Sequence, residues 1–181
     1  MTTYYTVDSG NYYSPGMVAR PITPSIQPIE LHNMVTNLFP RGVSKHGDGY
    51  FLSANAIAGQ INFSIDWGLE FYRRAMRPSA PSRYECIFAC ETLAGAIAFR
   101  AQYRSPNSPI YEVEADEGLI HRGDMALLNN AKSCLVYTYQ IEHYWAGTTF
   151  SQQPFWEILI PLPVTIGNRV PDVHLRAPAL S

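Results

Sequence analysis

IFACETLAGAIAFRAQYRSPNSPIYEVEAD, residues 87 to 116, is the stretch of sequence that decides the fold. An apolar strand over Glu85 to Ala89 is followed by a helical pattern that begins near Thr92, and its small side chains would let the helix lie close to a sheet. After a Pro/Asn/Ser turn, apolar and polar residues alternate from Ile110 to Glu114, which is typical of a strand with one buried face. Together these elements indicate an α+β domain with a mostly antiparallel sheet.

The N-terminal part of the chain predicts two strands and an irregular segment. Thr3 to Val7 is rich in Tyr and Thr and predicts a strand, and Met17 to Ile22 predicts a short second one. From Thr23 to Asn62, scattered prolines and glycines argue against long regular structure. Within that segment RGVSKHGDGYFLS, residues 41 to 53, predicts an exposed loop and strand. We therefore expect 23–62 to be a family-specific insertion.

The middle of the chain predicts helices with definite ends. Ser64 offers an N-cap to a helix over Ile65 to Met76, which has apolar residues at helical spacing and is followed by prolines. Asp124 opens a short helical pattern. Tyr139 to Trp145 predicts another short helix, closed by Gly147.

The C-terminal part predicts one strand and a tail. WEILIPLPVTI, residues 156 to 166, is the most apolar strand candidate, and Pro161 and Pro163 argue for a bulge or an edge position. Val170 to Ser181 reads as a loose tail. The sequence thus predicts a single domain over 1–169, followed by 170–181 as the tail.

Composition narrows the classes of function. The chain has 181 residues, enough for one core, and its net charge of -2 with 13 dispersed basic residues indicates no electrostatic site for nucleic acid. The three cysteines have no histidines at zinc-ligand spacing, so we predict reduced core residues and no metal site. Without a leader or an apolar run of about 18 residues, we expect a soluble, cytoplasmic protein with no membrane partner, although export as an effector needs no cleavable signal. The 12 tyrosines favour a pocket that suits planar rings.

These motifs resemble those of the rifampin ADP-ribosyltransferases and related uncharacterised bacterial domains. The resemblance implies an ADP-ribosyltransferase-like split, mostly antiparallel β-sheet with flanking helices, and NAD as a substrate. The motifs that carry it are, in chain order, Tyr4-Tyr5-Thr6-Val7, Pro15-Gly16 leading to Pro21, Ile87-Phe88-Ala89 with Thr92-Leu93, Ile110-Tyr111-Glu112-Val113-Glu114, and Asp124.

The resemblance also implies roles for single residues. Tyr5 stands where that family has a histidine, and Phe88 where it has the tyrosine that stacks on nicotinamide. Tyr4, Tyr5 and Thr6 on the first strand would then bind NAD, Tyr5 and Thr6 at its carboxamide. Arg83 would contact the pyrophosphate, as suits a guanidinium group. The aromatic residues could equally be core side chains, and Arg83 could pair with Glu85.

Three acids compete for the catalytic role. Breaking the bond between nicotinamide and ribose passes through an oxocarbenium-like state, which needs a nearby carboxylate. Asp124 matches the catalytic position of the rifampin-type enzymes. Glu142 lies in Tyr139-Gln140-Ile141-Glu142, which is similar to the Gln-x-Glu segment of the pertussis-toxin catalytic subunit family, although the Ser-Thr-Ser of that family is missing. Glu157 is an alternative acid, because Glu-Ile-Leu-Ile-Pro is similar to the acidic strand of mammalian-type ecto-transferases.

Each acid also has a structural explanation. Asp124 could cap a helix, Glu142 could favour the start of a helix through the macrodipole, and Glu157 could face solvent from a strand. Of the histidines, His32, His46, His121 and His174 are interpreted as surface residues.

The predicted function is an NAD-dependent mono-ADP-ribosyltransferase of bacterial toxin or effector type. It would release nicotinamide and modify an unknown acceptor, which could be a protein, a nucleobase or a small molecule. The segment 23–62 would carry acceptor or partner recognition, because loops on a rigid scaffold often do. The alternatives are a non-catalytic binding module of the same fold and an NAD glycohydrolase toxin.

Overall fold

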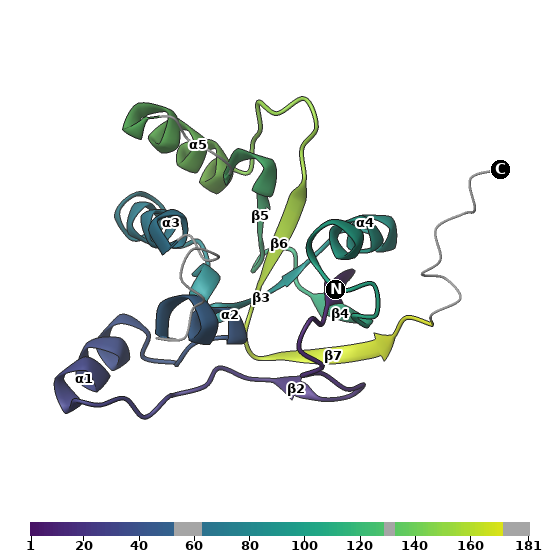
Figure 1. The fold of residues 1–181 in the computed structure, drawn as a ribbon, viewed down its shortest axis with the longest axis horizontal. Coiled ribbons are helices and arrows are strands. Elements are labelled where there is room, and N and C mark those ends of the chain that lie inside the picture. Colours follow the sequence, from purple (N-terminus) through teal and green to yellow (C-terminus); the bar gives the residue numbers. More distant parts are fainter. Residues whose placement is uncertain (53–62, 129–132, 172–181) are drawn as a thin grey trace.

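The computed structural model describes residues 1–52, 63–128 and 133–171, which form two antiparallel sheets with helices packed around them (Figure 1). This confirms the predicted α+β class. The four-stranded sheet has the order β1 (Thr2–Val7), β4 (Ile110–Ala115), β7 (Val164–Arg169) and β2 (Val18–Ala19). The three-stranded sheet has the order β3 (Cys86–Ala89), β6 (Trp156–Pro161) and β5 (His121–Asp124).

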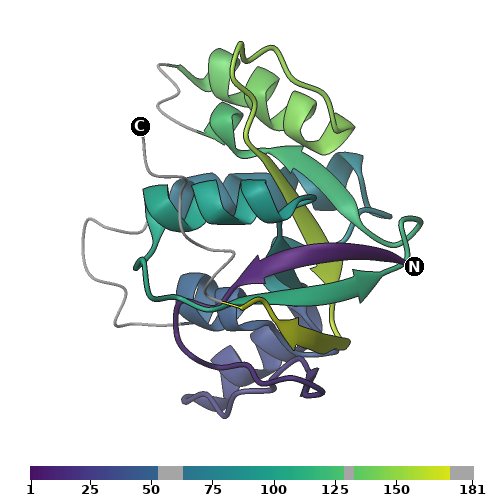
Figure 2. The ribbon, with the colours of Figure 1, turned by 90° about the vertical axis from the view of Figure 1, so that its right-hand side faces the viewer.

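The two sheets meet where β1 reaches the end of β3. Figure 2 shows β1 and β4 side by side, and the backbones of Tyr5 and Cys90 exchange hydrogen bonds of 3.0 and 2.8 Å. The hydroxyl of Thr6 adds a bond of 2.8 Å to the carbonyl oxygen of Phe88. The first strand is thereby fixed against both sheets.

The main core lies between the sheets. Strand alternation sends one set of side chains from each sheet into it, including Tyr4, Val113 and Ile166 from one sheet and Ile158 from the other. On β6, Leu159 points the opposite way, into a second cluster with α3 and α5. A strand buried on both faces explains why its sequence is almost continuously apolar.

Helices cover the three-stranded sheet unequally. α3 (Phe63–Met76) and α5 (Cys134–Ala146) lie on one side of it, and α4 (Leu93–Tyr103) lies on the other side, near β1 (Figure 1). Thr92 caps α4 by accepting a bond of 3.0 Å from the Gly95 amide, and Ala96 in this helix is fully buried. Gly147 ends α5 in a left-handed conformation, with a φ of 68°.

The segment 23–62 differs from the prediction. It contains α1 (Ile29–Leu38), α2 (Lys45–Gly47) and the π-helical turn η1 (Asp48–Leu52), so the expected lack of longer regular structure is wrong for the first of these. Residues 41–52 are not an exposed loop and strand, since Val43 and Ser44 are buried. Val43 belongs to a buried cluster with Phe39 and Tyr84, and the aromatic side chains of Tyr50 and Phe51 pack against that cluster. Residues 53–62 lie outside the described part of the chain.

Several helices and strands begin or end at other residues than the sequence predicted. α3 begins at Phe63, so Ser64 lies inside its first turn and not before it. Asp124 is the last residue of β5, a strand that the sequence did not indicate, and the 3₁₀ turn η3 (Met125–Leu128) follows. A second 3₁₀ turn, η2 (Arg83–Glu85), precedes β3.

The apolar run 156–166 forms two strands in place of one. β6 is the central strand of its sheet and β7 pairs with both β4 and β2, so the predicted edge position is wrong. Pro161 ends β6 and Pro163 lies in the connection, which is where proline is tolerated. The tail also begins later than predicted, because Val170 is 5% exposed and donates a bond of 2.8 Å to Ile110. Residues 172–181 are outside the described chain.

Candidate functional site

A cavity of about 900 Å³ lies where the two sheets meet, at the upper end of the range for small-molecule sites. Most of its wall is apolar or aromatic, with a few charged groups. Its lining includes Tyr5, Thr6, Asp8, Tyr12, Arg20, Lys45, His46, Tyr50, Asp66, Arg83, Phe88, Cys90, Arg104, Trp156 and Glu157.

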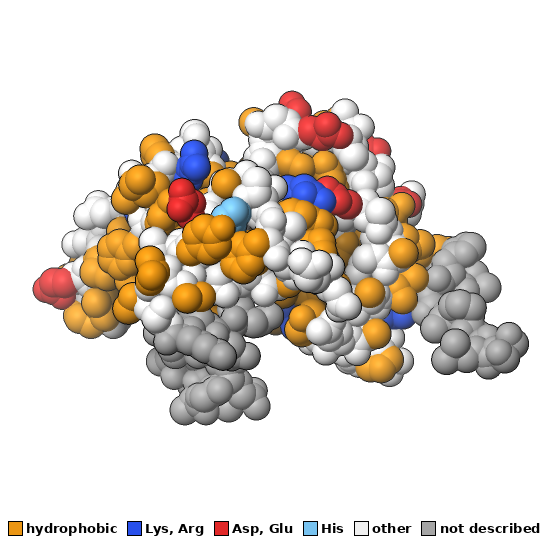
Figure 3. Space-filling view, turned by 90° about the horizontal axis from the view of Figure 1, so that it is seen from above, with side chains coloured by type: hydrophobic (Ala, Val, Ile, Leu, Met, Phe, Trp, Pro, Cys, Tyr) orange, Lys and Arg blue, Asp and Glu red, His pale blue; other side chains and the backbone are white. Residues whose placement is uncertain are grey.

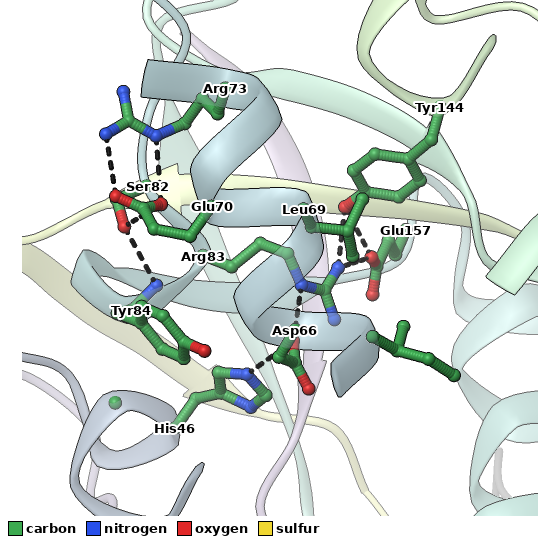
Figure 4. Close-up of polar contacts among 12 residues, drawn as sticks. His46, Asp66, Leu69, Glu70, Arg73, Ser82, Arg83, Tyr84, Tyr144 and Glu157 are labelled. Atoms are coloured by element: carbon green, nitrogen blue, oxygen red, sulfur yellow. Dashed lines mark hydrogen bonds and ion pairs between the residues drawn. The ribbon is translucent and has the colours of Figure 1, made fainter. Parts of the chain in front are cut away.

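A buried guanidinium organises one wall of this cavity (Figure 4). Arg83 Nε donates to Asp66 Oδ1 at 2.9 Å, while its Nη1 donates to Glu157 Oε1 and, at 2.6 Å, to the hydroxyl of Tyr144. That hydroxyl in turn donates to Glu157 Oε1 at 2.6 Å. Charges buried this deeply are stable only when paired, and here one cation serves two carboxylates.

The protonation states follow from these contacts. Burial alone would raise the pKa of Asp66, but Arg83 and His46 hold that pKa well below its usual range. Burial would lower the pKa of Arg83, whereas Glu157, Tyr144 and Asp66 raise it well above its ordinary value. Burial raises the pKa of Tyr144. At neutral pH the wall therefore holds an ionised Asp66 and a cationic Arg83, and the neutral Tyr144 bonds to Arg83 from outside the cavity lining.

A second buried cluster fixes the position of α3 beside this wall. Glu70 is 1% exposed and accepts bonds from Arg73 at 2.8 and 3.0 Å and from Ser82 at 2.9 Å. Because Ser82 directly precedes η2 and Glu70 lies one turn after Asp66, the cluster fixes the position of Asp66 relative to Arg83 (Figure 4).

His46 enters the cavity wall from α2. Its Nε2 lies 3.3 Å from Asp66 Oδ1, and its ring stacks on Tyr50 with centroids 4.2 Å apart. The ring also lies 4.6 Å from that of Phe88. Ser44 holds this turn by accepting a bond of 3.2 Å from the Gly47 amide. The prediction that His46 is a surface residue is wrong, because its side chain is only 17% exposed.

His121 is also not a surface residue, contrary to the prediction. Its ring lies 4.7 Å from that of Trp145, and burial lowers its pKa to about 4. Cys86 and Cys90 are free and buried, as predicted, and burial raises the pKa of the Cys90 thiol to about 11. Cys134 is exposed, so the prediction of a core position fails for it.

The structure brings together most of the predicted NAD-binding residues. Tyr5, Thr6, Arg83 and Phe88 all line the cavity. Tyr4 does not, because it points into the core between the sheets and is 4% exposed. Arg83 pairs with Asp66 and Glu157 and not with Glu85, so its charge is already balanced within the protein.

The three predicted acids lie in different surroundings. Asp124 is fully buried outside the cavity lining and accepts bonds from the amides of Ala126 and Phe155 at 2.9 and 2.7 Å, as a structural cap does. Glu142 is exposed on α5, whose start at Cys134 leaves it beyond the first turn, so the macrodipole argument fails. Of the three, Glu157 alone lines the cavity.

The cavity also contains cations other than Arg83 that could bind a phosphate group. Arg20 and Lys45 line it, and neither forms an ion pair with a carboxylate among the residues described. Lys45 Nζ lies 5.2 Å from the centroid of the Tyr12 ring. No group of three or more His, Cys, Asp or Glu side chains that could hold a metal ion occurs in residues 1–52, 63–128 and 133–171.

Among the described residues, the face of the molecule that Figure 3 shows carries no cluster of basic side chains. In Figure 3 the Lys and Arg side chains of one face are isolated from one another, with apolar side chains between them. Within the described part of the chain, no helix has both the length and the apolar character needed to cross a lipid bilayer.

Fold and site together define an α+β protein with a ligand-sized cavity walled by a buried ion network. The chain belongs to a family described as a protein of unknown function, DUF2441, whose model matches residues 31–172. No curated protein matches the chain.

Sequence reasoning missed His46 and Asp66 as parts of this wall, and Tyr144 as the buried partner of Arg83 and Glu157. They come from α2, α3 and α5, and no spacing in the sequence relates them. The one available signal was the pair of Arg83 and Glu157, a cation just before one strand and an acid in an apolar strand.

Proposed function

We propose that this protein is an NAD-dependent mono-ADP-ribosyltransferase with an ADP-ribosyltransferase-like split sheet, which releases nicotinamide and transfers ADP-ribose to an acceptor. The observation that carries the proposal is the position of Glu157. Its carboxylate lines the same cavity as Tyr5 and Thr6 of β1 and Phe88 of β3, the strands whose motifs resemble that class.

The acid that we propose is Glu157, in preference to Asp124 and Glu142. Its Oε1 is held by Arg83 and Tyr144, and no donor among the described residues contacts its Oε2. A fixed carboxylate in a largely apolar cavity would stabilise the positive charge that develops on the ribose.

The other side chains of the cavity are assigned to different parts of NAD. Phe88 offers a ring for stacking on nicotinamide. Tyr5 offers its hydroxyl group to the carboxamide, and the Thr6 hydroxyl, which donates its proton to the Phe88 carbonyl oxygen, can only accept a bond from it. Because Arg83 is engaged by two carboxylates, the pyrophosphate is assigned to Arg20 and Lys45 instead.

The experiment is one-dimensional proton NMR of NAD with the purified protein, with and without a crude cell lysate as acceptor source. The wild-type protein should produce free nicotinamide. Glu157→Gln keeps an oxygen acceptor for Arg83 and Tyr144 and should slow release by about 10²- to 10³-fold. Glu142→Gln, an acid-to-amide change outside the cavity, should have no effect. A Glu157→Gln protein with wild-type activity would refute the assignment.

Two observations favour a second candidate, a non-catalytic binding module. The bonds of Glu157 to Arg83 and Tyr144 are also those of a structural ion pair, and Tyr5 replaces the histidine of the similar enzymes. This candidate predicts broadened but uncleaved NAD signals. An NAD glycohydrolase would instead release ADP-ribose at the same rate without lysate.

A further inference from the structure

We propose that His46, oriented by Asp66, is the general base that removes the proton from the acceptor in this cavity. The inference rests on the proposed transferase function and adds to it a second catalytic group. That group comes from 23–62, the segment in which the sequence predicted acceptor recognition.

One nitrogen of the His46 ring is held and the other is free. Nε2 lies 3.3 Å from Asp66 Oδ1, whereas Nδ1 has no hydrogen-bond partner among the described residues. In that part of the chain the only buried side-chain nitrogen or oxygen without a partner is Gln140 Oε1, so Nδ1 is in contact with solvent. An imidazole with a carboxylate on one nitrogen and the other nitrogen open is the arrangement of a general base.

The ring is also held rigidly. Tyr50 stacks on it at 4.2 Å with an angle of 21° between the planes, and Phe88 packs at 4.6 Å. The turn that carries it is anchored by a bond of 2.7 Å from the Ser44 amide to the carbonyl oxygen of Tyr84. A group fixed in this way does not have to be ordered when the acceptor arrives.

Asp66 supplies a permanent negative charge beside the ring. Its Oδ1 contacts both Arg83 and His46 (Figure 4), and Arg83 keeps it ionised. The carboxylate therefore holds the Nε2–H tautomer and stabilises the imidazolium that forms when Nδ1 takes a proton.

The proposed step exchanges one bond at ribose C1′ for another. The bond from ribose C1′ to nicotinamide N1 breaks, and its electron pair neutralises the pyridinium, so nicotinamide leaves without needing a proton. An O–H or N–H nucleophile of the acceptor forms the new bond to C1′, and its proton passes to Nδ1 of His46. Glu157 stabilises the sugar while His46 activates the nucleophile.

His46 and Glu157 belong to one hydrogen-bonded chain. Asp66 and Arg83 connect them, so a proton gained by the His46 ring would change the electrostatic environment of the Glu157 carboxylate. The titratable and charged groups that face His46 from the elements packed against it are Asp66 from α3, Arg83 and Tyr84 from η2, and Tyr50 from η1.

The experiment compares wild type, His46→Gln, Asp66→Asn and His143→Gln as full-length proteins. NAD binding is measured by ligand-observed NMR, and nicotinamide release is followed as a function of pH, with and without lysate. His46→Gln should bind NAD as wild type does but react about 10²- to 10⁴-fold more slowly, and should lose the acidic limb of the pH profile. Asp66→Asn should make the rate of nicotinamide release depend less strongly on pH along that acidic limb. His143 is outside the cavity lining, and its variant should match wild type.

The outcomes separate this inference from the function on which it rests. If His46→Gln keeps the wild-type rate and pH profile while Glu157→Gln is inactive, the base is refuted and the transferase stands. If wild type releases no nicotinamide under either condition, both are refuted. A ¹⁵N spectrum gives a readout apart from activity, in which the inference requires a neutral His46 ring with its proton on Nε2, and a proton on Nδ1 alone would overturn it.

Discussion

Asp66 of α3 and Arg83 of η2 are joined by a hydrogen bond of 2.9 Å, with side chains only 8% and 9% exposed. Neither charge would be stable there alone, because removing an ion from water costs several kcal/mol. The bond ties a helix to the turn that leads into β3, and with Glu157 it sets the charge pattern of the cavity wall. Stability and the proposed chemistry thus depend on the same side chains.

Replacing Arg83 by Met should destabilise the protein by about 3 to 5 kcal/mol, because Asp66 and Glu157 would be left buried without their cation. Urea denaturation at pH 7 measures the loss. Arg41→Met is the control, since Arg41 is 64% exposed and 3.5 Å from Glu85, and it should change stability by less than about 0.5 kcal/mol. Equal losses in the two variants would contradict the role of the buried network.

Stability should fall as the pH decreases from about 6.5 to about 4, because of His121. Burial lowers its folded-state pKa to about 4, so the stability linked to it is fully present above the unfolded pKa near 6.5 and is lost as the ring is forced to protonate. The linked free energy is up to about 3 kcal/mol. Urea midpoints across this range measure it.

The matching variants identify the residue responsible. His121→Gln should flatten the dependence between pH 4 and 6.5, and His143→Gln should leave it unchanged. If both variants keep the wild-type slope, another group titrates in this window. Asp66, whose folded pKa is depressed, contributes stability that is present above its unfolded pKa near 3.9 and is lost only below it.

Gly47→Ala should cost about 1 to 3 kcal/mol by overpacking. A β-carbon there would lie 2.5 Å from the carbonyl oxygen of Tyr84 and 2.8 Å from Cβ of Val43, so α2 would have to move and take His46 away from Asp66. Gly49→Ala, two residues on, meets nothing within 4 Å and should be neutral or slightly stabilising. Thermal unfolding compares the two, and similar melting temperatures would rule out the close contact.

Thr6→Val should destabilise the protein by about 1 kcal/mol, because it removes the 2.8 Å hydrogen bond from β1 to the carbonyl oxygen of Phe88 with almost no change in volume. Thr3→Val on the same strand is the control, since Thr3 is exposed, and it should lie within about 0.5 kcal/mol of wild type. The expectation fails if urea denaturation cannot distinguish the two variants.

The parts of the fold that could be read from the sequence are those set by local rules. The strand, helix and strand of 86–115, the capping by Thr92 and the end of α5 at Gly147 follow from periodicity and from side chains that satisfy nearby backbone groups. The helix α1 could not be read in this way, because none of its side chains is fully buried and its position depends on contacts such as the bond from Arg74 to the Leu38 carbonyl.

The sequence by itself determined the class of fold, the strand, helix and strand of 86–115 and three acids that could serve one reaction. Only the tertiary structure showed which of these acids lies in the cavity, because Asp124 and Glu157 are on neighbouring strands and yet one faces backbone amides and the other the cavity. It also brought His46 to Asp66 and Arg83 to Glu157, which are 20 and 74 residues apart in the chain. Such pairs form when packing removes their charges from water, and no local pattern encodes that step.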